Sequence, residues 1–137
     1  FRQNMKQFLG AVTVVVPDYD AAIQFYTESL GFDLLEDTDL EDGKRWVLIA
    51  PPGATETRLL LAKAATPLQH AAIGHQTGGR VFLFLNTDDF GRDYAAFRDR
   101  GVVFREGPRY EPYGTVAVFE DPFGNAWDLI EPRSTAS

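Results

Sequence analysis

The chain runs Val12-Thr13-Val14-Val15-Val16-Pro17-Asp18 near its beginning, and this stretch decides its fold. The β-branched valines favour a strand, and Pro17 ends that strand where Asp18 can act as the N-cap of a helix. Apolar residues then recur at helical spacing from Tyr19 to Leu30, and Gly31 supplies a C-terminal stop. We therefore expect a strand, a helix and a glycine turn in this order.

Further strands are predicted directly after this helix. Phe32–Leu40 and Arg45–Ala50 flank the dipeptide Asp42-Gly43, which is a strong hairpin signal. Another short strand, Arg58–Ala62, follows the loop Pro51-Pro52-Gly53. The first half of the chain is thus predicted to be a β-α-β-β-β unit.

The same order of elements returns 71 residues later. At this offset Asp18 matches Asp89 and Tyr26 matches Phe97, and Gly101 ends the second predicted helix. The strands expected around that helix are Val81–Leu85, Val102–Arg105, Tyr113–Phe119 and Ala126–Ile130. Two copies of one unit explain this pattern most economically, although a coincidence of common strand and helix patterns stays open.

We therefore predict an α+β fold built from two tandem β-α-β-β-β modules within one domain, residues 8–132. Module one spans residues 8–63, a connector spans 64–79, and module two spans 80–132. Residues 1–4, which precede Met5, are interpreted as an expression remnant or an upstream stretch.

Composition excludes several function classes. The 137 residues include 13 basic and 20 acidic side chains, for a net charge of −7, which disfavours nucleic acid and anionic membrane surfaces. Without cysteine there is no disulfide, thiol nucleophile or thiolate metal site. No apolar stretch reaches the roughly 20 residues of a membrane span, so we expect a cytoplasmic protein.

The connector is the segment that does not fit the repeat. It holds both histidines, His70 and His75, which we interpret as surface residues in a loop rather than as metal ligands. Its stretch Gly74–Val81 imitates a phosphate-binding P-loop, but Arg80 and Val81 occupy the lysine and hydroxyl positions. A strand is also expected where such a loop needs a helix, so this motif is set aside.

Both ends of the predicted domain resemble a known family. The opening stretch with Phe25-Tyr26 and Leu30-Gly31-Phe32, and the closing stretch Asp121-Pro122-Phe123-Gly124-Asn125-Ala126-Trp127-Asp128-Leu129, resemble the vicinal oxygen chelate superfamily. That superfamily includes glyoxalase I, extradiol dioxygenases, fosfomycin resistance enzymes and bleomycin resistance proteins. The stretches Gly78–Leu85 and Tyr113–Phe119 are similar to a bacterial subgroup of it. The resemblance implies a glyoxalase-like open barrel around a cavity between the modules, and a homodimer.

The resemblance also implies where a divalent metal would bind. The family's ligand positions fall on Ala11, Phe82 and Asp128, and only Asp128 has a lone pair to offer. We therefore expect no metal cofactor of the family type.

Strand alternation predicts what the cavity presents instead. If Ala11 faces inward, the inward residues are Thr13, Val15, Phe82, Phe84, Asn86, Ala126, Asp128 and Ile130. Trp127 and Leu129 are then left to pack under the helices. Such an apolar and aromatic wall with a few polar groups is typical of a small-molecule pocket, although Phe82 and Phe84 could instead fill a core.

Candidate ligand-binding residues are therefore Thr13, Trp46, Phe82, Phe84, Asn86, Glu111, Tyr113 and Asp128. Asp128 is also the candidate catalytic residue, because an apolar wall would raise the pKa of its carboxyl toward the range useful for acid–base chemistry. Arg80 and Arg45 are its candidate partners, and a solvent-exposed or salt-bridged structural Asp128 is the alternative.

Three functions follow from these observations. The first is a protein that binds an apolar or aromatic small molecule in the cavity without the family's metal. The second is an enzyme of the lyase or dioxygenase type that depends on a divalent metal or on Asp128. The third is a domain that binds a protein partner. We place binding first, and the sequence names no ligand.

Overall fold

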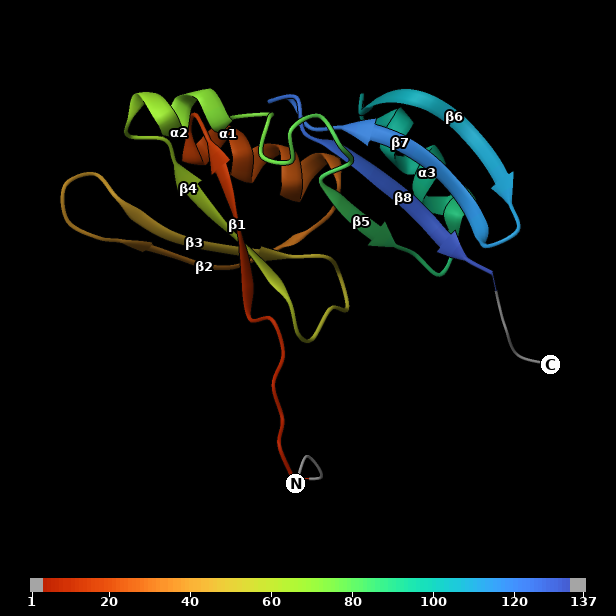
Figure 1. The fold of residues 1–137 in the computed structure, drawn as a ribbon, viewed down its shortest axis with the longest axis horizontal. Helices are drawn as coiled ribbons and strands as arrows, with labels where there is room; N and C mark the ends of the chain where they lie inside the picture. The colour runs from red at the N-terminus through yellow and green to blue at the C-terminus, as the bar shows by residue number, and fades with distance from the viewer. Residues whose placement is uncertain (1–3, 134–137) are drawn as a thin grey trace. The chain divides into compact units, whose positions relative to one another are not determined.

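The structure of the protein is a computed structural model that describes residues 4–133 (Figure 1). The chain divides into two compact units, one ending at Ala64 and the other beginning at Ala65. The interpretation of residues 1–4 as a remnant falls almost wholly outside the described residues. No helix among residues 4–133 has the length and apolar character needed to cross a membrane.

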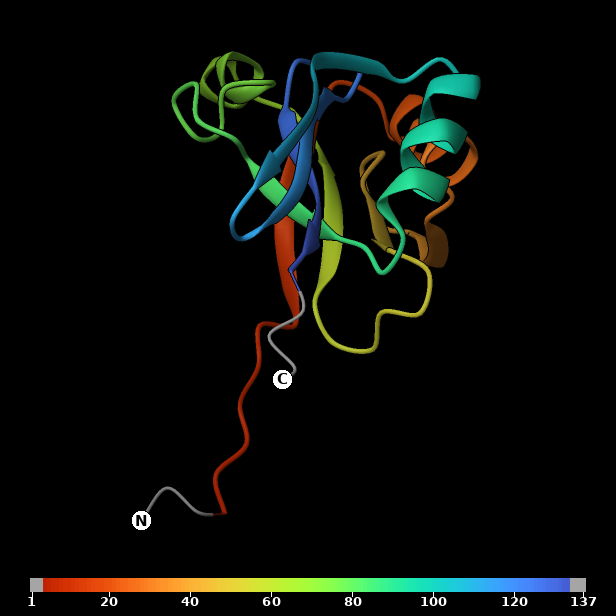
Figure 2. The same ribbon diagram turned by 90° about the vertical axis from the view of Figure 1, so that its right-hand side faces the viewer.

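The first unit is a four-stranded sheet with one helical segment. Its elements are β1 (Ala11–Val16), α1 (Tyr19–Gln24), the π-helical turn η1 (Phe25–Ser29), β2 (Asp33–Asp39), β3 (Arg45–Ala50) and β4 (Arg58–Lys63). The strand order is β1-β4-β3-β2. Strand β1 is parallel to β4, beside which it lies in Figure 2, and the other pairs are antiparallel.

The second unit repeats this topology after one extra helix. Its elements are α2 (Pro67–Ala72), β5 (Leu83–Asn86), α3 (Phe90–Asp99), β6 (Val103–Glu111), β7 (Gly114–Glu120) and β8 (Ala126–Pro132). The strand order is β5-β8-β7-β6, again with the first strand parallel to the last. The predicted α+β fold with two β-α-β-β-β modules is confirmed.

The helix caps show the repeat at atomic detail. The Asp18 carboxylate accepts a hydrogen bond from the amide of Ala21 at 2.8 Å, and the Asp89 carboxylate accepts one from the amide of Arg92 at 3.0 Å. Both aspartates hold the first turn of a helix, 71 residues apart, as their positions in the sequence predict.

The two cores differ in chemistry. In the first unit Ile49 and Leu59 are buried partners on neighbouring strands. In the second unit the corresponding partners are Phe119 and Trp127, whose rings stack with centroids 5.7 Å apart. Phe97 of α3 packs edge-on against Phe119 at 5.4 Å. At this pair of positions the first unit is therefore aliphatic and the second unit aromatic, although both cores contain residues of each kind.

The first helix is shorter than the sequence predicts. The pattern from Tyr19 to Leu30 indicated one regular helix, but the α-helix gives way to a π-helical turn at Phe25. The amide of Leu30 donates to the carbonyl of Phe25, five residues back, at 3.2 Å. The Thr27 hydroxyl donates to the carbonyl of Ile23 at 2.7 Å, and such side-chain competition for a backbone carbonyl favours bends in helices.

The connector contains a helix that the sequence interpretation missed. Thr66 caps α2 by accepting a hydrogen bond from the Gln69 amide at 3.1 Å, and Pro67 stands in the first turn. Threonine followed by proline and, three residues on, by glutamine is a recognisable helix start. His70 therefore lies on α2 and not in a loop, which corrects its predicted setting.

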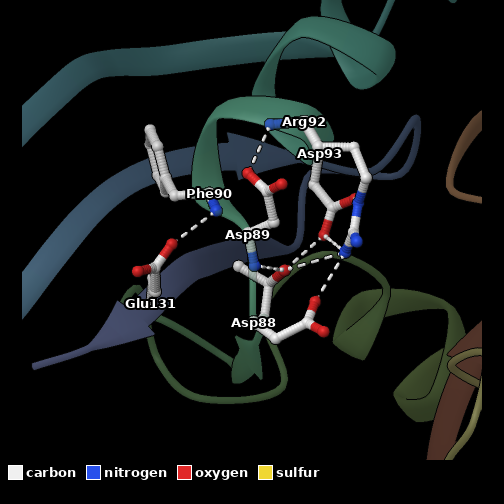
Figure 3. Close-up of polar contacts among 7 residues, drawn as sticks. Asp88, Asp89, Phe90, Arg92, Asp93 and Glu131 are labelled. Carbon is white, nitrogen blue, oxygen red and sulfur yellow. Dashed lines mark hydrogen bonds and ion pairs between the residues drawn. The ribbon is translucent and has the colours of Figure 1, made fainter. Parts of the chain in front are cut away.

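Helices α1 and α3 are each joined to the sheet of their own unit by a different polar contact. In the first unit the Arg45 guanidinium bridges Asp20 of α1 and Asp37 of β2, with nitrogen–oxygen distances of 2.9 and 2.7 Å. In the second unit the Glu131 carboxylate of β8 accepts a hydrogen bond from the Phe90 amide at 2.7 Å, as Figure 3 shows. The ends of both helices are thus fixed to the sheets that they cover.

Candidate functional site

In the second unit α3 packs on one face of the sheet, where Phe97 contacts Phe119, and no other described helix of this unit lies over the opposite face (Figure 1). Trp127 and Leu129 are buried on the α3 side, as predicted, and Trp127 stacks on Phe119 there. Because side chains alternate along a strand, Asp128 of β8 points to the opposite side. We call this opposite side the helix-free face.

Strand register places a row of side chains across the helix-free face. Asp128 on β8 lies opposite Phe84 on β5 and opposite Val118 on β7, and Val118 lies opposite Glu106 on β6. Directly opposed residues point to the same side of a sheet, so these four side chains share the face.

A second row of the same face runs beside the first one. It consists of Asn86 on β5, Ile130 on β8, Val116 on β7 and Arg109 on β6. The face therefore carries an aromatic ring and an amide at the β5 edge. Aliphatic residues and one carboxylate occupy its centre, and charged groups lie at the β6 edge.

Asp128 is the unusual member of these rows. Its Oδ1 atom is buried and has no hydrogen-bond partner among the described residues. Burial raises the pKa of Asp128 above its usual value; the positive charge of Arg109 opposes this shift and the negative charge of Glu106 adds to it. A carboxyl with a free buried oxygen and a raised pKa can accept a hydrogen bond from a ligand or, when protonated, donate one.

The charged groups near Asp128 differ from those expected. Arg45 belongs to the ion pairs of the first unit, and Arg80 is not among the charges that shift the pKa of Asp128. The nearby cation is Arg109, which is 3.4 Å from Glu106 and 2.8 Å from Glu111 between nitrogen and oxygen atoms. The Arg109 guanidinium therefore forms ion pairs with two carboxylates of β6, and Asp128 has no ion pair among the described residues.

The sequence interpretation missed Glu106 and Arg109 because it ended the strand at Arg105. Strand β6 continues to Glu111 and passes through Gly107-Pro108 with register shifts on either side. Bulges of this kind at a sheet edge accommodate proline and turn side chains toward a new direction. The proximity of both charged groups to Asp128 depends on those irregularities.

The two predicted aromatic residues have different surroundings. Phe84 is 65% exposed, so it does not fill a core of its own unit. Phe82 is partly buried and precedes β5, and its amide donates to the carbonyl of Ala126 at 2.7 Å. Phe82 also lines a small pocket with Arg105, away from the row that Phe84 shares with Asp128.

The other candidate residues fall into two groups. In the first sheet Thr13 lies opposite Leu60, and Trp46, 41% exposed, lies opposite Thr38. In the second unit Glu111 and Tyr113 lie at the β6–β7 hairpin. Register therefore brings together Phe84 and Asp128 in one row with Asn86 in the next, whereas Glu111 and Tyr113 lie at one end of their sheet.

The residues at the family's metal positions do not suit a metal. The side chains of Ala11 and Phe82 have no donor atom, which leaves the half-buried Asp128 carboxylate as the one side-chain donor among these positions. Among the described residues no three His, Asp or Glu side chains gather as a possible ligand set. The donor set therefore does not match the metal centre that the resemblance implies.

Comparison with known proteins decides the family. Residues 8–129 match the family described as the Glyoxalase/Bleomycin resistance protein/Dioxygenase superfamily. The chain belongs to this superfamily. Among relatives of the glyoxalase superfamily, an uncharacterised protein of Shewanella frigidimarina is 56% identical over 128 residues, which cover 93% of this chain and 95% of that protein.

Two solved structures show the same architecture. UcmS2 is 30% identical with a TM-score of 0.80, over 93% of this chain and 99% of that one. TnmS3 from Streptomyces sp. CB03234, an antibiotic-binding protein, is 37% identical with a TM-score of 0.76, over 93% of this chain and 98% of that one. The glyoxalase fold is thus shared with at least one protein that binds an antibiotic.

Proposed function

We propose that this glyoxalase-superfamily protein binds an apolar or aromatic small molecule without the family's metal. The observation that carries the proposal is the helix-free face of the second sheet. There an exposed Phe84 ring stands directly opposite Asp128, whose buried Oδ1 has no partner among the described residues. An aromatic ring beside an unused hydrogen-bonding group can hold a flat ligand and fix its orientation.

Two further observations support binding rather than metal chemistry. The residues at the metal positions of the superfamily include a methyl group and a phenyl ring, which cannot coordinate an ion. TnmS3, which resembles this chain over nearly its whole length, is an antibiotic-binding protein. Thr13 and Trp46 of the first sheet, and Phe82 and Asn86 of the second unit, stay candidate ligand-binding residues. The roles of Glu111 and Tyr113 at its rim stay predictions.

Site-directed variants test the proposal. The probes are planar polycyclic compounds, namely naphthoquinone, quinoline and acridine, titrated calorimetrically into the purified protein. At least one compound is expected to bind in the nanomolar to micromolar range. Phe84→Ala is expected to weaken its binding about tenfold or more, because a central aromatic contact is lost. Asp128→Asn is expected to weaken it less, because the amide keeps one hydrogen-bonding oxygen.

Tyr110→Ala provides the matched control. Tyr110 is an 81% exposed aromatic residue of β6 and lies opposite Thr115, outside the two rows of the helix-free face. Its removal should leave ligand binding unchanged. Equal losses in Phe84→Ala and Tyr110→Ala would show that exposed aromatic rings bind the probes without a specific site.

The second candidate function is an enzyme of the lyase or dioxygenase type with Asp128 as its acid–base group. The raised pKa of Asp128 favours it, since a carboxyl that holds its proton nearer neutral pH can transfer it to a substrate. An enzyme of this kind would lose turnover in Asp128→Asn while still binding its substrate. A protein that only binds would show no turnover to lose.

We also propose a cytoplasmic homodimer, as the family resemblance implies. Sedimentation at micromolar concentration should give a species of about twice the 15.3 kDa chain mass. A single species at the chain mass would contradict this part of the proposal.

A further inference from the structure

A small pocket lies in the second unit, where the connector meets the turn between β7 and β8. Its volume is about 170 Å³. The side chains that line it include His75, Thr77, Arg80, Phe82, Arg105 and Asn125, and the other lining residues are three glycines and an alanine. No carboxylate lines the pocket, although the chain as a whole carries a net charge of −7.

The walls of this pocket are held in place by close backbone packing. Gly74 has a left-handed φ of +73°, and a Cβ atom there would lie 2.2 Å from the carbonyl oxygen of Phe123. The Asp121 carboxylate is buried and accepts hydrogen bonds from the Phe123 amide at 3.0 Å and from the Asn125 side chain at 2.7 Å. The connector and the turn therefore meet at a fixed distance, so the pocket is formed before any ligand arrives.

The two arginines of the pocket differ in what they already bind. Arg105 donates from Nε to Glu120 at 2.6 Å and from a terminal nitrogen to the carbonyl of Gly124 at 3.1 Å. Its charge is thus matched, although further N–H donors remain. The Arg80 guanidinium forms no ion pair or hydrogen bond with the described residues, while the Thr77 hydroxyl holds the Arg80 carbonyl at 2.6 Å. Arg80 therefore supplies an uncompensated positive charge on a fixed backbone.

We propose that this pocket binds a small anion that carries a carboxylate or a phosphate, with Arg80 as its main charge partner. The planar fork of a guanidinium matches both groups with paired hydrogen bonds. The volume is well below the roughly 300–1,000 Å³ of pockets for drug-sized ligands and holds only about five or six waters. The site is thus too small for the polycyclic ligand proposed above, and of the residues predicted to bind that ligand it includes only Phe82.

The mode of binding differs from the P-loop that the same glycine-rich stretch imitates. Residues 81 and 82 and then strand β5 follow Arg80, so no helix begins there to bind an anion with its N-terminal amides. Side-chain guanidinium groups take that role here. Gly74 lets the connector backbone pass close to Phe123 beside the pocket.

The probes for this site are inorganic phosphate and acetate, titrated separately at constant ionic strength. Amide resonances of Gly74, Gly79 and Gly124 are followed by two-dimensional NMR. We expect saturable shifts with millimolar affinity for at least one anion. Arg80→Gln should weaken that affinity about tenfold, the usual effect of losing one charge-assisted pair. Arg98→Gln is the matched control, because Arg98 lies over the Tyr94 ring on α3 and not in the pocket.

The two anions distinguish the possible ligands of the pocket. Shifts with phosphate alone indicate that the ligand carries a phosphate. Shifts with acetate alone indicate a carboxylate, and shifts with both anions indicate that the site accepts either group. Gly74→Ala, which moves the connector away from Phe123, should abolish the shifts even though it leaves both arginines in place. The proposal is overturned if neither anion shifts these amides, or if Arg80→Gln and Arg98→Gln titrate alike.

Discussion

The two sheets carry different side chains at matching positions of their repeated topology. In the first sheet one row across the strands consists of Thr13, Leu60, Leu48 and Glu36. In the second sheet the corresponding row consists of Phe84, Asp128, Val118 and Glu106. The edge glutamate and the central aliphatic residue are common to both rows. The difference lies in the first two positions, where threonine and leucine become phenylalanine and aspartate.

This difference separates what the fold requires from what the site requires. Both units keep an aspartate N-cap and a buried aromatic residue at the same place in the helix, Tyr26 and Phe97. A leucine at the centre of a sheet is explained by packing. A half-buried carboxylate lowers stability unless it forms hydrogen bonds or an ion pair, with the protein or with a ligand. The second sheet is therefore where we place ligand recognition.

The largest expected effect is the loss of stability when a buried core residue is truncated at matching positions of the two units. Phe119→Ala should lower the free energy of unfolding by about 3–5 kcal/mol, because Phe119 is fully buried and contacts the rings of Phe97 and Trp127. Ile49→Ala, at the matching position of the first unit, should cost less, near the lower end of the roughly 2–5 kcal/mol usual for this substitution. Urea unfolding followed by circular dichroism measures both. A larger loss of unfolding free energy in Ile49→Ala than in Phe119→Ala would contradict this order.

Next come two hairpin glycines, Gly43 and Gly114, which also stand 71 residues apart. A Cβ atom at Gly114 would lie 2.4 Å from the carbonyl oxygen of Glu131, whereas Gly43 has open space around it and only a left-handed φ of +75°. Gly114→Ala should therefore cost about 2–4 kcal/mol, because backbone must move. Gly43→Ala should cost about 1–2 kcal/mol for the backbone conformation alone. Equal losses in thermal unfolding would contradict the difference.

The smallest expected effect concerns how stability depends on pH. Ionisation of Asp37 and ionisation of Asp128 should change the free energy of unfolding in opposite directions. The hydrogen bond from Arg45 lowers the pKa of Asp37, so its contribution to stability is present at neutral pH and is lost as pH falls below about 4. Burial raises the pKa of Asp128, so its ionisation destabilises the fold as pH rises through about 4 and beyond.

Unfolding free energies at acidic and at neutral pH test these signs. Relative to the parent, Asp37→Asn should be less stable by about 0.5–1 kcal/mol at neutral pH, and this deficit should vanish in acid. The stability of Asp128→Asn relative to the parent should instead rise by about 1 kcal/mol from acid to neutral pH, because the variant buries no ionised carboxylate at position 128. The same sign for both variants would show that Asp128 is a salt-bridged structural residue.

The fold was predictable because each element has a local cause. The valine strand, the Asp18 cap and the glycine stop can be read directly, and their return 71 residues later predicts the second unit. Helix α2 could have been predicted from Thr66-Pro67-Leu68-Gln69, which has the residues of a capped helix start. The π-helical turn could not, because it depends on which carbonyl the Thr27 hydroxyl binds.

The candidate site was only partly predictable. Alternation along β8 separates Asp128 from Trp127 without any structure. That Phe84 stands opposite Asp128 requires the strand order β5-β8, which a single sequence does not give. The charges of Glu106 and Arg109 reach the site through irregular pairing in β6, and bulges follow no simple periodicity.

The central claim is that this superfamily member binds a planar apolar ligand without a metal. The most direct test is elemental analysis of protein purified without chelator, joined to calorimetric titrations with the naphthoquinone, quinoline and acridine probes before and after chelator treatment. We predict no stoichiometric divalent ion and nanomolar to micromolar binding that is unchanged when zinc or manganese is added. Binding that appears only after a divalent ion is restored, or a stoichiometric ion in the protein as purified, would contradict the claim.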